Sequence, residues 1–227
     1  MIKTVVFDLD DTLYDEIDYC KSGLASVADF LADLPETPNA RGIFDCLWKE
    51  FTAGNRTKTF NAALDRLGID YDEKLIRELV KVYRNHVPKI TLPADSKNVL
   101  DRLSRKYTLA LLTDGFLPAQ QLKVHALGIE KYFKTIIYTE QLGREFWKPS
   151  PAGFQRLIEA LNVPPETAAY IADNEKKDFI APNNLGLLTI QIVRPARLHT
   201  ESSDQPGAAA LHIIRKISRI PDLLERL

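Results

Sequence analysis

The pattern of apolar and polar positions divides this chain into two parts of different texture. A short apolar run at 4–7, rich in β-branched and aromatic residues, predicts a buried strand. From Asp15 to about Pro93 the apolar residues recur at helical spacing, and proline and glycine interrupt them at intervals. This long segment therefore predicts a set of helices without a strand.

After Asp95 the pattern alternates between helix and strand, which indicates crossover connections and a parallel sheet. The chain is polar from Arg194 to Gly207, and residues 201–207 within this segment predict a mobile loop. A short apolar run near 211–217 and a helix from Pro221 follow it. The β-rich stretches of this part are 107–112, 135–138, 169–172 and 187–193.

Both textures fit an α/β fold in which a parallel sheet core, flanked by helices, carries an all-helical insert. We expect residues 1–14 and 94–227 to form the core and residues 15–93 to form the insert. A chain of 227 residues, 45% of them hydrophobic, is long enough to bury the core of one large domain with such an insert.

The charge of the chain narrows the classes of partner. Charged residues make up 27% of the sequence but the net charge is −1, so no broad basic field favours a nucleic acid polymer or an anionic membrane. No window approaches the ~20 apolar residues of a membrane span, and residues 1–4 lead into a strand without a signal peptide. We therefore expect a cytoplasmic globular protein with a small substrate; the sequence does not define its oligomeric state.

The cysteines and histidines suggest no site of their own. Cys20 and Cys46 fall on helical patterns without metal-ligand spacing, which indicates buried free thiols in a reducing compartment rather than a disulfide or a nucleophile. The four histidines share no spacing, so we assign none of them a catalytic role.

An acidic cluster follows the first predicted strand directly. Asp8, Asp10 and Asp11 come after the apolar run, and Thr12 ends the cluster. Ligands of open α/β sheets bind at the carboxyl ends of the strands, and this cluster lies at such an end. Carboxylates gathered there repel one another unless a cation lies among them, and Mg²⁺ prefers oxygen ligands of this kind. The cluster therefore predicts a metal-dependent active site.

Three further strand ends carry groups that bind phosphate or metal. The second core strand runs into a hydroxyl and turn amides suited to phosphate oxygens, a lysine after the third strand supplies a point charge, and the fourth strand ends in a second acidic site. These residues are Thr113, Asp114 and Gly115, then Lys148, then Asp173 and Asp178.

Taken in order, these groups make the chain resemble the haloacid dehalogenase superfamily of phosphotransferases over nearly its whole length. Its four motifs match Asp8-x-Asp10-x-Thr12, Thr113, Lys148, and Asp173 with Asp178. The resemblance implies a Rossmann-like core and identifies the helical insert with the small helical cap of the phosphoglycolate-phosphatase-like and nucleotidase-like branches. Three departures from the family pattern are Ala172 in place of the usual glycine, Asp114 in place of a frequent asparagine, and a slightly long stretch at 143–147.

The resemblance also implies a mechanism that the residue types support. Asp8 would attack phosphorus to form an aspartyl-phosphate. Asp10 would protonate the leaving oxygen and later deprotonate the water that breaks the intermediate. Mg²⁺ would be held by the Asp8 carboxylate, the Asp10 backbone carbonyl and Asp173.

The remaining motif residues support these three. Thr113 and Lys148 would bind the phosphoryl oxygens, and Thr12 would hydrogen-bond to the two catalytic aspartates. Asp178 would orient Lys148 or a water molecule in the metal site, or it would merely cap a helix. Asp114 and Gly115 are candidates for substrate binding, although Asp114, like Asp11, equally suits a helix cap or a solvated loop.

The insert contains one further candidate. The segment 54–60 joins two helical patterns and carries Arg56 and Lys58 near hydroxyl groups. Two cations at a helix start can bind an anionic or polyhydroxyl part of a substrate. Equally, Arg56 and Lys58 can be solvated surface charges.

The function expected from these features is a Mg²⁺-dependent phosphatase for a small phosphorylated metabolite, such as a sugar phosphate, a nucleoside monophosphate or a small phospho-acid. The alternatives are a phosphomutase or phosphotransferase on a sugar phosphate, and a non-catalytic binding protein on the same fold. A dehalogenase is disfavoured because halide leaves without a proton and needs no acid at Asp10. A signalling receiver domain is disfavoured because its phosphoacceptor lies in the middle of a single domain without a helical insert. In this chain the acidic pair follows the first strand.

Overall fold

The computed structural model describes all residues from Met1 to Leu227 and divides them into two compact units. Residues 1–17 and 91–227 form the core unit, and residues 18–90 form the helical unit. Each boundary lies three residues from the position expected from the sequence. Each unit is described separately below.

A six-stranded, wholly parallel sheet forms the centre of the core unit, in the order β3-β2-β1-β4-β5-β6. The first strand, β1, is central: Thr4 pairs with Thr108 on one side and with Ala168 on the other. Its apolar residues are fully buried, as expected for a strand covered on both faces. The strands are β1 (Thr4–Phe7), β2 (Thr108–Thr113), β3 (Thr135–Tyr138), β4 (Ala168–Ala172), β5 (Leu188–Ile192) and β6 (His212–Ile214).

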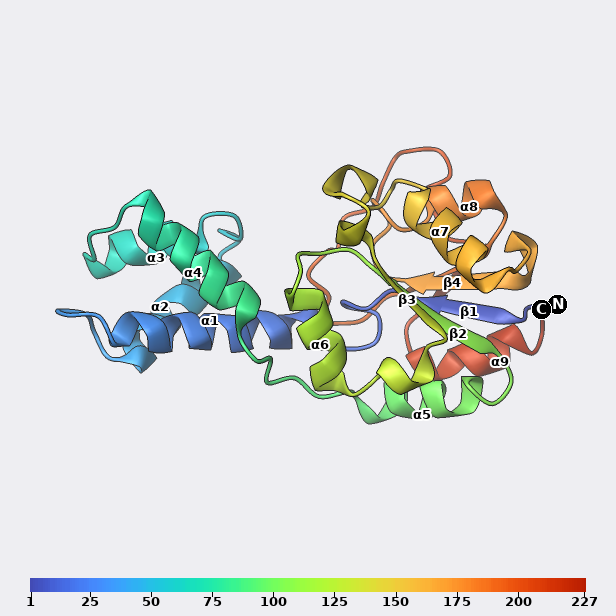
Figure 1. Ribbon diagram of the computed structural model, residues 1–227, viewed down its shortest axis with the longest axis horizontal. Helices are drawn as coiled ribbons and strands as arrows, with labels where there is room; N and C mark the ends of the chain where they lie inside the picture. The colour runs from blue at the N-terminus through green and yellow to red at the C-terminus, as the bar shows by residue number, and fades with distance from the viewer. The chain divides into compact units, whose positions relative to one another are not determined.

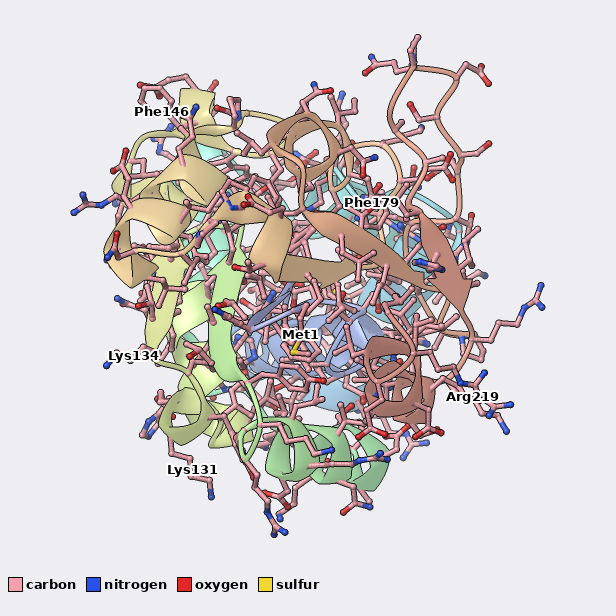
Figure 2. The ribbon with its side chains drawn as sticks, turned by 90° about the vertical axis from the view of Figure 1, so that its right-hand side faces the viewer. Met1, Lys131, Lys134, Phe146, Phe179 and Arg219 are labelled. Atoms are coloured by element: carbon pink, nitrogen blue, oxygen red, sulfur yellow. The ribbon has the colours of Figure 1, made fainter.

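Helices cover both faces of this sheet (Figure 1). One layer contains α7 and α8, and the opposite layer contains α5 and α9. Seen along the sheet, Met1 lies near the middle while Lys131, Lys134 and Arg219 lie at the periphery, as a central first strand requires (Figure 2). The helices of the core unit are α5 (Ala94–Leu103), α6 (Ala119–Leu127), α7 (Ala152–Leu161), α8 (Ile180–Leu185) and α9 (Ile220–Leu224).

The helical unit contains no strand, in agreement with the sequence pattern. Asn39 and Asp72 cap the second and fourth helices by accepting backbone hydrogen bonds, and Gly68 ends the third in the left-handed conformation. Cys20 and Cys46 are buried thiols that form no disulfide, as predicted. The helices are α1 (Glu16–Ala32), α2 (Ala40–Thr52), α3 (Thr59–Leu67) and α4 (Glu73–Asn85).

The polar segment 194–207 contains no helix or strand, and the part that precedes the predicted loop 201–207 is fastened to the rest of the core unit. The Leu198 backbone N–H donates to Asp11 Oδ2 at 2.6 Å, and Arg194 Nε donates to Asp15 Oδ1 at 2.6 Å. These contacts with residues that follow β1 bring the loop to the carboxyl edge of the sheet. No helix of the structure has the length and apolar character needed to cross a membrane.

Candidate active site

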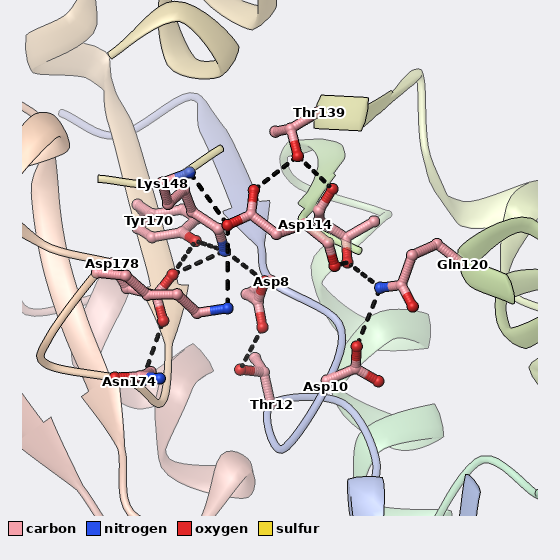
Figure 3. Close-up of polar contacts among 12 residues, drawn as sticks. Asp8, Asp10, Thr12, Asp114, Gln120, Thr139, Lys148, Tyr170, Asn174 and Asp178 are labelled. Carbon is pink, nitrogen blue, oxygen red and sulfur yellow. Dashed lines mark hydrogen bonds and ion pairs between the residues drawn. The ribbon is translucent and has the colours of Figure 1, made fainter. Parts of the chain in front are cut away.

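The carboxyl ends of β1, β2 and β4 deliver the predicted motif residues to one place (Figure 3). Asp8 is 3% exposed, and its Oδ1 accepts a hydrogen bond of 2.6 Å from Lys148 Nζ. The same ammonium lies 2.7 Å from Asp178 Oδ1 and donates to the Tyr170 hydroxyl at 3.0 Å. Burial raises the pKa of Asp8 to about 6, although the Lys148 charge opposes the rise. Asp8 is thus a buried carboxylate held in position by a fixed cation.

The side chain of Asp10 occupies a separate cradle formed largely by α6. Lys123 Nζ donates to both carboxylate oxygens, at 2.8 and 2.9 Å, and Gln120 Nε2 donates at 3.0 Å. The Tyr14 hydroxyl donates a further hydrogen bond. Burial alone would raise the pKa of Asp10, but the charge and hydrogen bonds of Lys123, together with the hydrogen bonds of Tyr14 and Gln120, outweigh burial and hold the pKa below its usual range.

A glycine makes room for this cradle. Gly115 has φ of +138°, and a Cβ at this position would lie 2.8 Å from the Gln120 side chain. The absence of a Cβ lets Gln120 reach both Asp10 and the hydroxyl of Thr113, to which it donates at 2.6 Å. Gly115 therefore shapes the site through the space it leaves.

Among the residues of the site, the Asp173 carboxylate most clearly lacks a hydrogen-bond donor or a cation. It is 4% exposed, and its Oδ2 is buried without any hydrogen-bond donor. Burial, together with the charges of Asp178 and Asp8, raises the pKa of Asp173 to about 9. No three Asp, Glu, His or Cys side chains are arranged to hold a metal on their own. A cation bound here would therefore rest on two carboxylates, Asp8 and Asp173, completed by a backbone oxygen and water.

Two other predicted aspartates are already engaged by the protein. Asp114 accepts from the Thr139 hydroxyl at 2.7 Å and from the Lys148 backbone N–H at 3.1 Å, so it fixes the segment that carries Lys148. Asp178 accepts from the Asn174 backbone N–H at 3.0 Å in addition to its contact with Lys148. The structure thus places Asp178 where it orients Lys148.

The remaining residues of the first motif have supporting positions. Thr12 Oγ1 lies 3.5 Å from Asp8 Oδ2, a long hydrogen bond, and makes no contact with Asp10. Asp11 accepts from the backbone N–H of Glu16, the first residue of α1, at 2.9 Å and from that of Leu198. It therefore caps a helix, one of the roles considered for it, and also anchors a loop.

These groups line a pocket of about 310 Å³ in the core unit. Its volume suits a small ligand at the lower end of the usual range of pocket sizes. The lining residues are Asp8, Asp10, Asp11, Glu16, Asp114, Gly115, Trp147, Lys148, Asp173, Asn174, Lys177 and His199.

Several residues of the site were missed in the sequence. Gln120 and Lys123 are three residues apart on α6, and both are buried. Two polar residues at this spacing on the apolar face of a predicted helix are the sequence feature that could have identified them. Tyr170 gave no such signal because it lies within an apolar strand. His199 and Lys177 belong to loops, and only their position in the fold brings them to the pocket.

The two candidates of the helical unit lie on an exposed loop between α2 and α3. Both Arg56 and Lys58 are exposed, and the Arg56 guanidinium lies 5.7 Å from the ring centre of Phe51. This arrangement is compatible with either role considered for them.

Comparison with known proteins gives matches along most of the chain. Residues 2–186 match the family described as haloacid dehalogenase-like hydrolase. A glyceraldehyde 3-phosphate phosphatase from Methanopyrus kandleri is 30% identical over 86% of this chain and 85% of its own. An N-acylneuraminate-9-phosphatase from Mus musculus is 24% identical over 100% and 95%. The crystal structure of a 2-haloacid dehalogenase from Pseudomonas syringae has a TM-score of 0.67, 25% identity and coverage of 100% and 99%.

Proposed function

The chain belongs to the haloacid dehalogenase-like hydrolase family, and we propose that it is a Mg²⁺-dependent phosphatase that hydrolyses a small phosphomonoester through an aspartyl-phosphate. The observation that carries this proposal is the buried Asp8 carboxylate, which lines the pocket and is held by Lys148. A second carboxylate, Asp10, follows two positions later in the sequence and lines the same pocket. The family and the fold class expected from the sequence are confirmed, as is the enzyme class of phosphoric monoester hydrolase.

Asp8 is the proposed nucleophile. One of its oxygens is held by Lys148 at 2.6 Å, which leaves the other, with only the long contact to Thr12, to attack phosphorus. The attack forms a bond between this oxygen and phosphorus, and the bond from phosphorus to the leaving oxygen breaks. A rigidly held carboxylate loses little freedom on reaching the transition state.

Asp10 is the proposed general acid and base. It would give a proton to the leaving oxygen and later accept one from the water that hydrolyses the aspartyl-phosphate. Lys123 and Gln120 favour its charged form in the resting site. Asp10 would therefore take up a proton from solvent as the anionic substrate binds beside it, give that proton to the leaving oxygen, and be left as the carboxylate that serves as base in the second step.

The donor set at the acidic edge fits Mg²⁺. The orphaned oxygen of Asp173, the Asp8 carboxylate and the backbone carbonyl of Asp10 would hold it, since all are oxygen ligands. When bound, Mg²⁺ supplies positive charge between an anionic nucleophile and an anionic substrate. Asp178 was also expected in the metal site, but its protein donors favour the alternative role, orienting Lys148.

The substrate-binding residues complete the proposal. Thr113 offers its hydroxyl, and the backbone at Asp114 and Gly115 offers turn amides, to the phosphoryl oxygens. Arg56 and Lys58 are proposed to bind the part of the substrate remote from phosphorus. The relatives named as phosphatases for glyceraldehyde 3-phosphate and N-acylneuraminate 9-phosphate support a small phosphorylated metabolite as substrate.

A screen of phosphorylated metabolites tests this function. Glyceraldehyde 3-phosphate, hexose phosphates, nucleoside monophosphates and small phospho-acids are incubated with the purified protein, in Mg²⁺ or in excess chelator. We expect release of inorganic phosphate only with Mg²⁺. A parallel incubation with 2-chloropropionate should release no chloride, because Asp10 equips the site for a leaving group that needs a proton. Chloride release, or turnover undiminished by chelation, contradicts the proposal.

A further inference from the structure

The ammonium of Lys148, the lysine of the third motif, is engaged by groups of the protein. An ammonium group has three N–H donors. Lys148 Nζ faces three acceptors: Asp8 Oδ1 at 2.6 Å, Asp178 Oδ1 at 2.7 Å and the Tyr170 hydroxyl at 3.0 Å (Figure 3). Its side chain is 1% exposed. In this arrangement the Lys148 ammonium is directed at three acceptors of the protein itself.

A second lysine lines the same pocket and is not occupied in this way. The side chain of Lys177 is 34% exposed, and its Nζ lies 3.9 Å from Asp114 Oδ2, beyond hydrogen-bond distance. Asp114 does not compete for this ammonium because both of its oxygens already accept shorter hydrogen bonds, from Thr139 and from the Lys148 backbone. Lys177 is therefore the lysine of the pocket with donors free to meet a ligand.

The backbone that carries Lys177 is fixed although its ammonium is not. The turn from Asn174 to Asp178 is closed by backbone hydrogen bonds from Lys177 N and Asp178 N to the Asn174 carbonyl, at 3.2 and 3.0 Å. The Asn174 N–H in return donates to Asp178 Oδ2 at 3.0 Å. A fixed backbone with a flexible four-carbon side chain allows a small movement of the charge onto a bound anion.

We propose that Lys177 supplies an additional cationic contact to the non-bridging oxygens of the phosphoryl group, beside Lys148, which also holds Asp8 in its attacking position. This inference rests on the proposed phosphatase function. A phosphoryl dianion that approaches Asp8 meets a carboxylate, and charge-assisted hydrogen bonds from a nearby ammonium offset the repulsion. These roles explain why the pocket contains two lysines.

Binding of inorganic phosphate to the Mg²⁺-loaded protein tests the inference, measured by isothermal titration calorimetry. Lys177→Met should weaken phosphate binding by about 10- to 100-fold, the range for one lost hydrogen bond to a charged group. Lys177→Arg keeps the charge and should retain most of the affinity. The matched control is Lys176→Met: the neighbouring side chain is exposed and does not line the pocket, so phosphate affinity should stay within about twofold of the wild type.

Binding of Mg²⁺ alone separates this role from a structural one. Removal of a cation from among Asp8, Asp173 and Asp178 lowers the repulsion that Mg²⁺ meets, so Lys177→Met should bind Mg²⁺ at least as tightly as the wild type. Weaker binding of both ions would show that Lys177 only maintains the site, which overturns the inference. Equal phosphate affinity in Lys177→Met and Lys176→Met overturns it as well.

The outcomes also distinguish this inference from the function on which it rests. If the wild-type protein hydrolyses no phosphomonoester with Mg²⁺, the proposed function fails. If the wild type is active and Lys177→Met keeps both its phosphate affinity and its KM, the function stands and only the role of Lys177 is lost.

Discussion

Replacing Lys123 tests how the structure controls the general acid and base. The Lys123 side chain is 4% exposed and donates to both oxygens of Asp10, at 2.8 and 2.9 Å. In Lys123→Met the apolar stem remains and the charge is lost. The Asp10 carboxylate, whose side chain is 18% exposed, then keeps only the neutral donors Gln120 and Tyr14.

The expected loss of stability follows from the burial of this pair. Removing one partner of a buried ion pair costs about 3–5 kcal/mol, and the partial exposure of Asp10 together with its two remaining donors favours the lower end of that range. For a chain of this size about 3 kcal/mol corresponds to a melting temperature lower by roughly 6–12 °C. Because the pKa of Asp10 in the folded protein lies below its usual range, the stability contributed by the pair is present at neutral pH and disappears as the solution becomes strongly acidic.

The same substitution should change the pH dependence of catalysis. Without Lys123 the pKa of Asp10 rises, so the acidic limb of the kcat profile should move to higher pH. Thermal melting at pH 7 and kcat between pH 5 and 9 are the measurements. Gln121→Met, on the exposed side of the same helix, is the control and should change neither quantity.

A second variant makes the reasoning refutable even if Lys123→Met is poorly stable. The double variant Lys123→Met with Asp10→Asn also removes the Asp10 carboxylate that lost its cation, leaving only Glu16 of the acidic partners of Lys123, and should melt above Lys123→Met alone. If Lys123→Met melts with the Gln121→Met control and keeps the wild-type pH profile, the account of the Asp10 cradle is wrong.

Three further outcomes are expected. Ca²⁺ should inhibit turnover in Mg²⁺, because a larger ion with looser coordination lets the Asp8 carboxylate bind through both oxygens; unchanged initial rates at equal concentrations of the two ions would contradict this. Burial raises the pKa of Asp173 to about 9 and that of Asp8 to about 6, so the metal-free folded protein binds more protons than the unfolded chain between about pH 4 and 9. Its melting temperature should therefore fall as pH rises through this range, and the rise produced by Mg²⁺ should be larger at pH 8.5 than at pH 6; equal rises would refute the assignment. Arg56→Ala should raise KM for the natural substrate by about 10- to 100-fold while changing hydrolysis of p-nitrophenyl phosphate little, with the exposed Arg41→Ala as control; equal losses on both substrates would remove Arg56 from substrate binding.

The sequence predicts the core fold well because its signals are local and strong. An apolar run that stops at an acidic cluster identifies β1 and its carboxyl end, and Asp8 is indeed buried there. Parallel strands must then bring their carboxyl ends to the same edge, which accounts for the proximity of Lys148 and Asp173 to Asp8. The positions of the four motifs at strand ends therefore predict which residues come together in the site.

The hydrogen-bond partners of each motif residue depend on how the elements pack, so the sequence pattern does not predict them. Lys123 reaches Asp10 across 113 residues of sequence because α6 packs beside the first motif, and Tyr170 reaches Lys148 from the interior of a strand. The segment 194–207 is polar in sequence, and the pattern does not show that its Leu198 backbone N–H finds a carboxylate acceptor in Asp11. Hydrogen bonds of this kind are decided by three-dimensional placement, so residue type alone cannot predict them.

The identity of the phosphorylated residue tests the central claim most directly. Asp10→Asn slows hydrolysis of the intermediate but leaves Asp8 intact, so p-nitrophenyl phosphate, which has a good leaving group, should drive accumulation of an aspartyl-phosphate. Rapid acid quench followed by mass spectrometry of peptides locates the adduct. We predict a phosphate on Asp8 that requires Mg²⁺ and is absent from Asp8→Asn. An adduct on any other residue, or turnover that survives Asp8→Asn, would contradict the account.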